Sequence, residues 1–536
     1  MTDLDAKEIM RRYAEGKTRR ANWESHWSEC YAYALPQREP SVAVETPGAK
    51  RTDKLFDGTA PDAVEQLAAS LLSQLTPPWA RWFGLSEGAD LTPEEREFVA
   101  PQLEKVSAVL QAHFDRSNFA VEMHQCYLDL VTAGTACLMF EEAPFGEATA
   151  FRFLAVPLSQ VVFEETADGV LAATFRRSEM RPDDLVRRFP NAEIPDGLTA
   201  RGRDDPAFRV PVIEAVVPLG GRFAYRAVAE TGLGAADGAT MLSAGDFAHS
   251  PFINFRWLKA PGEIYGRSPV MKTLPDIKTA NKVVELILKN ASIAVTGIWQ
   301  ADDDGVLNPA AIKLVPGTII PKAVGSAGLS PLQAPGRFDI SQLVLDDLRK
   351  QIHKALLADK LGQPDQPRMT ATEVLERSAE IARLLGATYG RLQAELLTPL
   401  IERAVALLGR RGAIPEIRVD GHSVELEYKS PLARQQARQD AQNAVLWLET
   451  LRMLGPEGLA SVDQSAAVEW LAKAFGVPRG LIRPTADPAM VDALPASDGL
   501  EALVEGAANM IGGAAAAAGA PLVAGLQPAG GADAAR

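Results

Sequence analysis

The feature that most constrains this chain is a helix-periodic run from position 370 to 411. Apolar residues recur along it close to one helical face, at Val374, Ile381, Leu385, Leu392, Leu396, Leu400, Val405 and Leu408. At ~1.5 Å per residue this helix would be on the order of 60 Å long, whereas typical globular helices run ~8–20 residues. Pro399 lies inside the run, removes one backbone hydrogen bond and predicts a kink. Such a helix is typical of a subunit that spans an assembly; the alternative is a core helix ending near Pro399, followed by a second helix.

The composition sets wide limits on the fold and narrower ones on the partners. The 536 residues suit several ordinary domains or one extended subunit, and the 47% hydrophobic content supplies an ample core. The net charge of −14 argues against tight, non-specific wrapping of nucleic acid. An acidic surface would repel a DNA duplex and would still let it slide past. Cys30, Cys126 and Cys137 are scattered without CxxC spacing, which indicates reduced thiols in a cytosolic protein.

Neither end of the chain predicts a targeting or membrane segment. Residues 1–12 mix charges and lack an apolar stretch, so we expect no secretory signal. The uncharged stretch 506–532 is mostly Ala and Gly and contains Pro521 and Pro528. It lacks a flanking basic cluster, and we interpret it as part of a flexible tail rather than a membrane span.

Apolar periodicity and turn residues predict an α+β chain that is mainly helical. The expected helices cover residues 1–35, 55–75, two segments between 93 and 138 that break near Ser117-Asn118, 182–189, 268–291, 340–361, the long run itself and 431–475. The expected strands cover 151–156, 161–164, 170–175, several segments between 210 and 257, turn-rich material in 292–337, and a hairpin over 417–428.

The usual catalytic motifs are incomplete in this sequence. None of the six His is paired at helical spacing with another, and HExxH is missing, so we expect no metal site. Gly16-Lys17-Thr18 resembles the end of a phosphate-binding loop, but Arg11 stands where the first glycine should be. A nucleophile elbow is also missing. We therefore predict a protein that is not an enzyme and needs no cofactor; a hydrolase using a carboxylate pair is the weakest alternative.

One cationic cluster stands out on the expected helix 340–361. Lys350 and Lys354 share a helical face, with Arg349 beside them and Lys360 further along. One interpretation is a solvated helix face. The other is light contact with a nucleic-acid backbone.

Six motifs, taken in order, resemble the portal (head-to-tail connector) proteins of short-tailed, podovirus-type bacteriophages. They are the segment 51–83 (Phe56-Asp57-Gly58-Thr59, a helix and the proline- and tryptophan-rich corner 75–83), Ser117-Asn118-Phe119, Gly134-Thr135-Ala136, Tyr265-Gly266-Arg267-Ser268-Pro269, Thr370-Ala371-Thr372-Glu373-Val374 and Ser430-Pro431-Leu432-Ala433-Arg434. Their coverage runs from about residue 5 to 490. Each motif is weak alone, and the weight lies in their order and spacing.

The resemblance implies a structural subunit of a ring, usually of twelve copies, at one capsid vertex, through which double-stranded DNA is packaged and ejected. It implies a wing over 1–267, a first stem helix over 268–291, a clip over 292–337 and a second stem helix over 338–361. A tunnel loop over 362–369, a long wing helix and hairpin over 370–430, a crown over 431–500 and a flexible tail over 501–536 would follow.

The same resemblance implies partners and candidate channel residues. The large terminase and a tail adaptor would meet the clip, capsid and scaffolding proteins would meet the wing, and no membrane would be involved. The protein would reside in the virion after assembly in the host cytoplasm. The DNA-facing candidates are Arg349, Lys350, Lys354, Lys360, Gln363, Gln366 and Arg368. The alternative is a non-viral oligomeric adaptor without a DNA channel.

Overall fold

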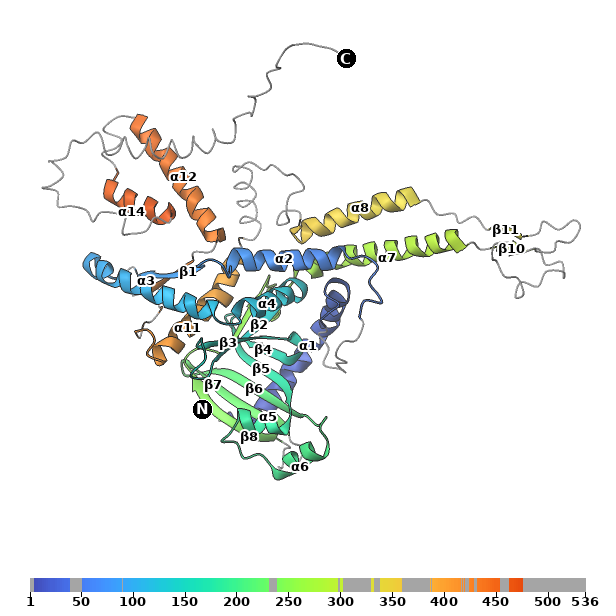
Figure 1. The fold of residues 1–536 in the computed structure, drawn as a ribbon, viewed down its shortest axis with the longest axis horizontal. Coiled ribbons are helices and arrows are strands. Elements are labelled where there is room, and N and C mark those ends of the chain that lie inside the picture. The colour runs from blue at the N-terminus through green and yellow to red at the C-terminus, as the bar shows by residue number, and fades with distance from the viewer. Residues whose placement is uncertain are drawn as a thin grey trace, which may run out of the picture. The chain divides into compact units, whose positions relative to one another are not determined.

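The fold is described from a computed structural model of the chain. It describes residues 4–38, 51–88, 90–230, 239–296, 299–301, 329–331, 338–358, 386, 388–415, 417, 419, 424–428, 431–453 and 462–475 (Figure 1). The chain divides into two compact units, Met1–Gln436 and Ala437–Arg536. The boundary falls inside helix α12 (Pro431–Met453), and the second unit also holds α14 (Gln464–Phe475).

The main core of the first unit lies between helices and a small antiparallel sheet. The helices are α1 (Ala6–Ala34), α2 (Thr59–Leu75), α3 (Pro93–Asp115) and α4 (Phe119–Ala133). The sheet has the order β3 (Phe151–Val156), β2 (Thr135–Glu142), β9 (Phe252–Arg256). Every residue from Thr135 to Phe140 is buried, as expected for a central strand covered on both faces. Large aromatic side chains, Trp27 and Trp82 among them, fill the space around it.

Side chains close both edges of this three-stranded sheet. Asn118, at the start of α4, accepts a hydrogen bond from the Phe153 amide at 3.0 Å and donates one to the Phe153 carbonyl at 2.8 Å. On the opposite edge, the Arg256 amide donates to the Glu395 carboxylate at 2.9 Å. Edge backbone groups that are paired in this way are less available to a strand from another chain.

A five-stranded antiparallel sheet forms the second layer of this unit. Its order is β4 (Val161–Glu165), β5 (Leu171–Met180), β6 (Val210–Leu219), β7 (Arg222–Glu230), β8 (Ala239–Phe247), and the short helix η1 (Leu158–Gln160) precedes it. Side chains on a strand alternate between faces. Accordingly Ile213 packs with the start of α1, whereas Val212 packs on the opposite face with α5 (Pro182–Arg188) and α6 (Asp196–Asp204).

Local capping explains why the predicted helices begin and end close to where the sequence indicates. Thr92 and Glu95 form a complete capping box at the start of α3. The break predicted near Ser117-Asn118 is confirmed, since α3 ends at Asp115 and α4 begins at Phe119. The prediction that the second helix runs to about 138 was wrong. Gly134 adopts φ +78° and ends α4, so β2 starts at Thr135.

A long-range strand pair involves a segment that the sequence places in a hairpin. β12 (Val424–Tyr428) pairs antiparallel with β1 (Phe83–Glu87), a pairing that the sequence did not predict. The pairing of 424–428 with 417–419 stays a prediction, because 418 and the turn 420–423 lie outside the described residues. Phe83 lies opposite Tyr428 and is fully buried, so the apolar corner before it contributes to the core.

The described part of the long helical run contains an irregular turn. A π-helical turn, η3 (Gln393–Leu397), leads directly into α11 (Thr398–Arg410). Pro399 has no amide hydrogen to donate to the Glu395 carbonyl, and the Thr398 amide bonds instead to the Gln393 carbonyl, five residues back. The lost hydrogen bond at Pro399 thus coincides with a π turn; the kink itself stays a prediction. Residues 370–385 of the predicted helix lie outside the described residues.

Candidate nucleic-acid channel

The candidate site is carried by two helices that lie side by side (Figure 1). They are α7 (Pro269–Thr296) and α8 (Phe338–Ala355), and the strand pair β10 (Trp299–Ala301) and β11 (Leu329–Pro331) lies beyond their far ends. Ile287 of α7 packs against the main core, to which Leu345 and Ile352 of α8 also belong. The apolar residues of α8 recur at helical spacing, and the helix is strongly amphipathic.

Two of the sequence motifs meet at the root of α7. The Ser268 hydroxyl accepts a hydrogen bond from the Met271 amide at 2.9 Å, which caps the helix, and donates to the Thr132 carbonyl at 2.8 Å. The Gly266 amide donates to the Thr135 hydroxyl at 2.8 Å. These bonds fix the start of α7 to the junction of α4 and β2.

A second polar contact fixes α7 further along its length. The Asn281 side chain donates to the Lys54 carbonyl at 2.8 Å, and its oxygen accepts from the amides of Phe56 and Asp57 at 2.6 and 3.1 Å. The Asn281 side chain is buried, which strengthens these bonds relative to bonds in open solvent. The segment before α2 is thereby held against α7.

The same segment also holds α8. The Asp57 carboxylate accepts from the Thr59 amide at 2.9 Å and from the Arg349 guanidinium at 2.7 and 3.0 Å. Burial acts to raise the pKa of Asp57, but the hydrogen bonds from Thr59 and Arg349 outweigh it and lower the pKa. Asp57, Asn281 and Arg349 therefore form one polar clamp that joins α2, α7 and α8.

Replacing Asp57 with asparagine should destabilise this clamp. The change removes a charge-assisted pair from a site where Asp57 is buried, and we expect a loss of about 1–3 kcal/mol in the free energy of unfolding at pH 7. The pKa of Asp57 is lowered in the folded protein. The ionised carboxylate therefore contributes stability above the unfolded pKa of about 4, and loses it as the pH falls through the folded value.

Chemical denaturation of Asp57→Asn and wild type at pH 7 and pH 3 measures the difference in their free energies of unfolding. Asp62→Asn is the matched control, because Asp62 is exposed on α2, five residues further along the chain, and its carboxylate contacts only Gln66 in the hydrogen bonds described. A stability difference that stays constant between the two pH values would contradict the clamp.

The structure separates the predicted cationic cluster into two kinds of residue. Arg349 is engaged by Asp57, which is buried, so its charge is compensated within the chain. Lys350 and Lys354 are exposed on α8, and no ion pair to either is found within the described residues. Lys360, Gln363, Gln366 and Arg368 lie outside the described residues. Two of the seven candidates thus stand as exposed cations on the helix.

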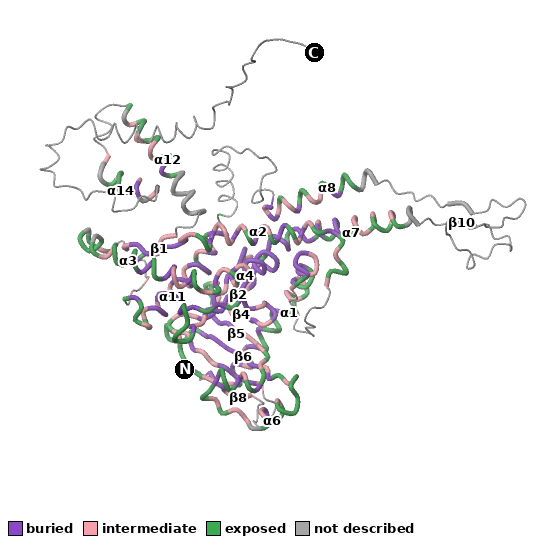
Figure 2. The backbone as a smooth tube through the Cα atoms, viewed as in Figure 1, coloured by how far each residue is buried: buried purple, intermediate pink, exposed green. Residues whose placement is uncertain are grey.

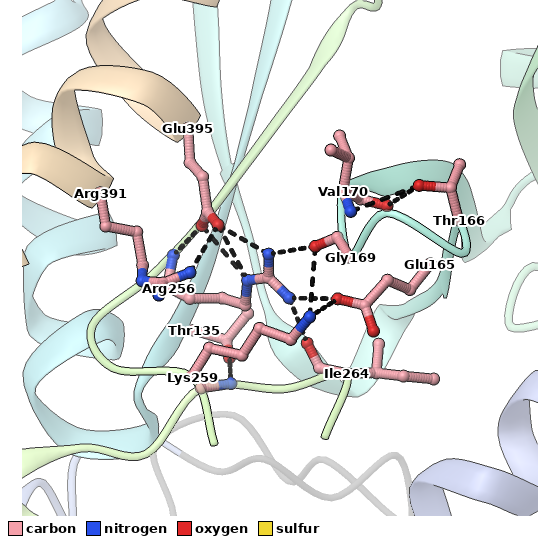
Figure 3. A network of polar contacts seen from close by, with 11 residues as sticks. Thr135, Glu165, Thr166, Gly169, Val170, Arg256, Lys259, Ile264, Arg391 and Glu395 are labelled. Carbon is pink, nitrogen blue, oxygen red and sulfur yellow. Dashed lines mark hydrogen bonds and ion pairs between the residues drawn. The ribbon is translucent and has the colours of Figure 1, made fainter. Parts of the chain in front are cut away.

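A buried charge network that the sequence did not predict lies between η3, near the described start of the long helical run, and strand β9 (Figure 3). The Arg256 guanidinium, on a residue only 1% exposed, pairs with Glu395 of η3 at 2.6 Å and with Glu165 of β4 at 3.0 Å. Lys259 also pairs with Glu165, and Arg391 pairs with Glu395 at 3.2 Å. The network joins β9, the β4–β5 hairpin and the π turn. No sequence motif could signal it, because its members are single charged residues from distant segments.

The described residues offer no candidate metal site, membrane-spanning helix or reactive thiol. There, no group of three or more His, Cys, Asp or Glu side chains could hold a metal ion. None of the described helices has the length and apolar content needed to cross a bilayer. Cys30, Cys126 and Cys137 are free and buried, and burial raises the pKa of each thiol, that of Cys30 to about 12. Such thiols are inert at neutral pH.

Comparison with known proteins identifies the family. The family model described as bacteriophage head to tail connecting protein matches residues 6–482. The chain belongs to this family. It is 26% identical over 520 residues to the "Probable portal protein" of Bordetella phage BPP-1, covering 91% of this chain and 90% of that protein. It is 23% identical to the portal protein of Salmonella phage epsilon15, covering 90% of each, and 22% identical to that of Escherichia phage T7, covering 76% and 75%.

A solved structure, "Virion of native gene transfer agent (GTA) particle", is similar at lower level. It shares 12% sequence identity, the match covers 84% of this chain and 99% of that one, and the TM-score is 0.35. The family membership itself confirms the resemblance drawn from the motifs and the α+β, mainly helical class. Two of those motifs have a direct structural role in this chain. The motif around Asp57 forms the polar clamp, and the motif around Ser268 anchors the root of α7.

Proposed function

We propose that this chain is the structural portal subunit of a phage, which forms the channel at one capsid vertex through which double-stranded DNA is packaged and ejected. The observation that carries the proposal is the family match over residues 6–482 together with portal relatives aligned over nine-tenths of both chains. A non-viral adaptor is not favoured by these relatives. The proposal gives the chain no catalytic step.

Several finer assignments belong to this proposal. The ring would contain twelve copies, with α7 and α8 in the stem, residues 292–337 as the clip and residues 1–267 as the wing. The packaging motor and a tail adaptor would bind at the clip, and capsid and scaffolding proteins at the wing. The subunits would assemble in the host cytoplasm and remain in the virion. Support for the stem comes from the anchored root of α7 and from the clamp that holds α8.

The charge distribution supports a channel that binds DNA only weakly. The net charge of −14 makes the chain as a whole repel phosphates. Lys350 and Lys354 would supply a few local contacts, each worth little in physiological salt. DNA that must move through a channel at high rates requires such weak, sequence-independent contacts.

Genetic complementation tests the proposed function. Virus particles produced without this chain should contain no nuclease-protected DNA, and supplying the chain in trans should restore the DNA. Full protected DNA content in particles that lack the chain would overturn the proposal.

Replacing Lys350 and Lys354 together with glutamine should impair DNA packaging or retention more than ring assembly. Both side chains are exposed, so the free energy of unfolding should change by less than about 0.5 kcal/mol. We expect normal ring yield and a several-fold loss of DNA-filled particles, measured by density-gradient separation.

The matched control replaces Lys17 of α1 and Lys105 of α3, two exposed lysines away from the candidate channel, with glutamine. It changes the net charge by the same amount and should leave packaging unchanged. Loss of ring formation in the Lys350/Lys354 variant, with packaging intact in the control, would contradict the assignment of these lysines to the channel.

A further inference from the structure

The outer parts of α7 and α8 expose apolar side chains that the fold of one chain does not use. Beyond the polar clamp, Leu286 of α7 is 49% exposed and Leu343 of α8 is 74% exposed. Figure 2 shows burial decreasing along both helices toward the strand pair β10–β11. Leucines this exposed on a helix pair mark a surface that another protein covers.

The charges around these two leucines have opposite signs. On α7, Lys282 precedes Leu286 by one helical turn and Lys289 follows it by one. Both lysines contact a single carboxylate, Glu285, at 2.9 and 2.6 Å, so two ammonium groups share one acid and the surface is net positive.

On α8, two acids follow Leu343 by one turn. Asp346 accepts a hydrogen bond from Gln342 at 3.1 Å, and Asp347 accepts one from Gln351 at 2.8 Å. These amides are neutral, and neither acid has an ion pair among the described residues. Within the turn that follows Leu343 the charge is therefore net negative, and Lys350 lies one further turn along the helix.

The two surfaces lie at about the same height along the helix pair. Asn281 of α7 and Arg349 of α8 both reach the segment before α2, which fixes the heights of the two helices relative to each other. Leu286 lies five residues beyond Asn281, or about 7.5 Å, and Leu343 lies six residues beyond Arg349, or about 9 Å, in the same direction. Copies related by rotation about an axis along the helices would keep these heights matched.

We propose that the acidic surface of α8, formed by Leu343, Asp346 and Asp347, packs against the basic surface of α7, formed by Lys282, Leu286 and Lys289, on the next copy of this chain. This interface rests on the proposed function, because it supplies the stem contact of a ring. Contacts of α7 with α7, or of α8 with α8, would oppose like charges. Only the unlike pairing is favourable, and such a head-to-tail contact generates a ring when the rotation between neighbouring copies closes.

Charge reversal tests the interface. One variant carries Asp346→Lys and Asp347→Lys, and the other carries Lys282→Glu and Lys289→Glu. Each variant alone opposes like charges at every interface, and we expect the ring fraction in low salt to fall by about tenfold or more, measured by mass photometry and electron microscopy. Circular dichroism and thermal unfolding establish that each variant is folded.

Mixing the two variants tests whether restored charge complementarity restores the ring. In an alternating ring, the new lysines of α8 meet the new glutamates of α7, and the native acids of α8 meet the native lysines of α7. Rings should therefore return in the mixture, and also in one chain that carries all four changes. The control pair Lys17→Glu and Lys105→Glu should form rings normally.

The failure of this inference differs from failure of the proposed function. Wild-type rings together with normal rings from each variant alone would overturn the interface and leave the portal assignment standing. Variants that fail alone and stay ring-free when mixed would also overturn it. A wild-type chain that forms no rings would overturn both.

Discussion

Replacing Gly266 with alanine should destabilise the first unit by about 3 kcal/mol or more, near the upper end of what overpacking costs. A Cβ atom at this position would lie under 3.0 Å from the backbone carbonyl oxygen of Gly134. Gly134 in turn takes φ +78°, and a Cβ there would meet the backbone of Gly266 and Arg267. Backbone cannot rotate away as a side chain can, so β2 and the root of α7 must separate.

Gly245→Ala is the matched control, because nothing lies within 4 Å of a Cβ at that position. Denaturant titration of both variants measures the difference in unfolding midpoint. Equal midpoints for Gly266→Ala and Gly245→Ala would show that the close approach of Gly134 and Gly266 does not exist.

Replacing Arg256 with methionine should cost about 3–5 kcal/mol, because it breaks a buried ion network and leaves carboxylates without their partner. The Arg256 guanidinium donates to Glu395 and Glu165, and also to the carbonyls of Ile264 and Gly169 at 3.0 and 3.1 Å. Methionine retains apolar volume but satisfies none of these acceptors. The loss should appear in the unfolding midpoint and in faster amide exchange around η3.

One control variant and one double variant test whether the loss comes from the buried network. Arg152→Met removes an exposed pair with Glu147, whose side chain is 42% exposed, and should cost less than about 1 kcal/mol. Adding Glu395→Gln to Arg256→Met should recover part of the loss, since it removes a carboxylate that would keep only Arg391 as its ionic partner. An Arg256→Met variant as stable as Arg152→Met would contradict the network.

The pH dependence of the Arg256 network follows from Glu165. Burial acts to raise its pKa, but hydrogen bonds from Lys259 and Arg256 outweigh burial and lower it. The ionised Glu165 therefore stabilises the fold above its unfolded pKa of about 4.3, and this contribution disappears as the pH falls through the lower folded value. The stability gap between wild type and Arg256→Met should narrow in acid.

The helices could be predicted because their signals are local. Thr92 and Glu95 cap α3 within four residues of each other, and Asn118 marks the break before α4. Ser268 and Pro269 start α7 where the sequence indicates. The end of α4 was misjudged because apolar residues continue without interruption from α4 into β2, and only Gly134 separates them.

Long-range pairings could not be predicted, because nothing in a short window specifies a distant partner. β1 pairs with β12 across more than three hundred residues of sequence. Arg349 illustrates the same limit in the candidate site. Its helical neighbours grouped it with Lys350 and Lys354, whereas its actual partner, Asp57, is 292 residues away. The exposure of the two lysines follows from the apolar period of α8, which places them away from Leu345 and Ile352.

Electron microscopy of the purified protein, with class averages of end-on views, tests the portal assignment most directly. The account predicts closed rings, twelve-fold in symmetry, with a central hole of ~20 Å or more that admits a DNA duplex (estimated from groove dimensions). Monomers or open chains across a range of salt concentrations would contradict it.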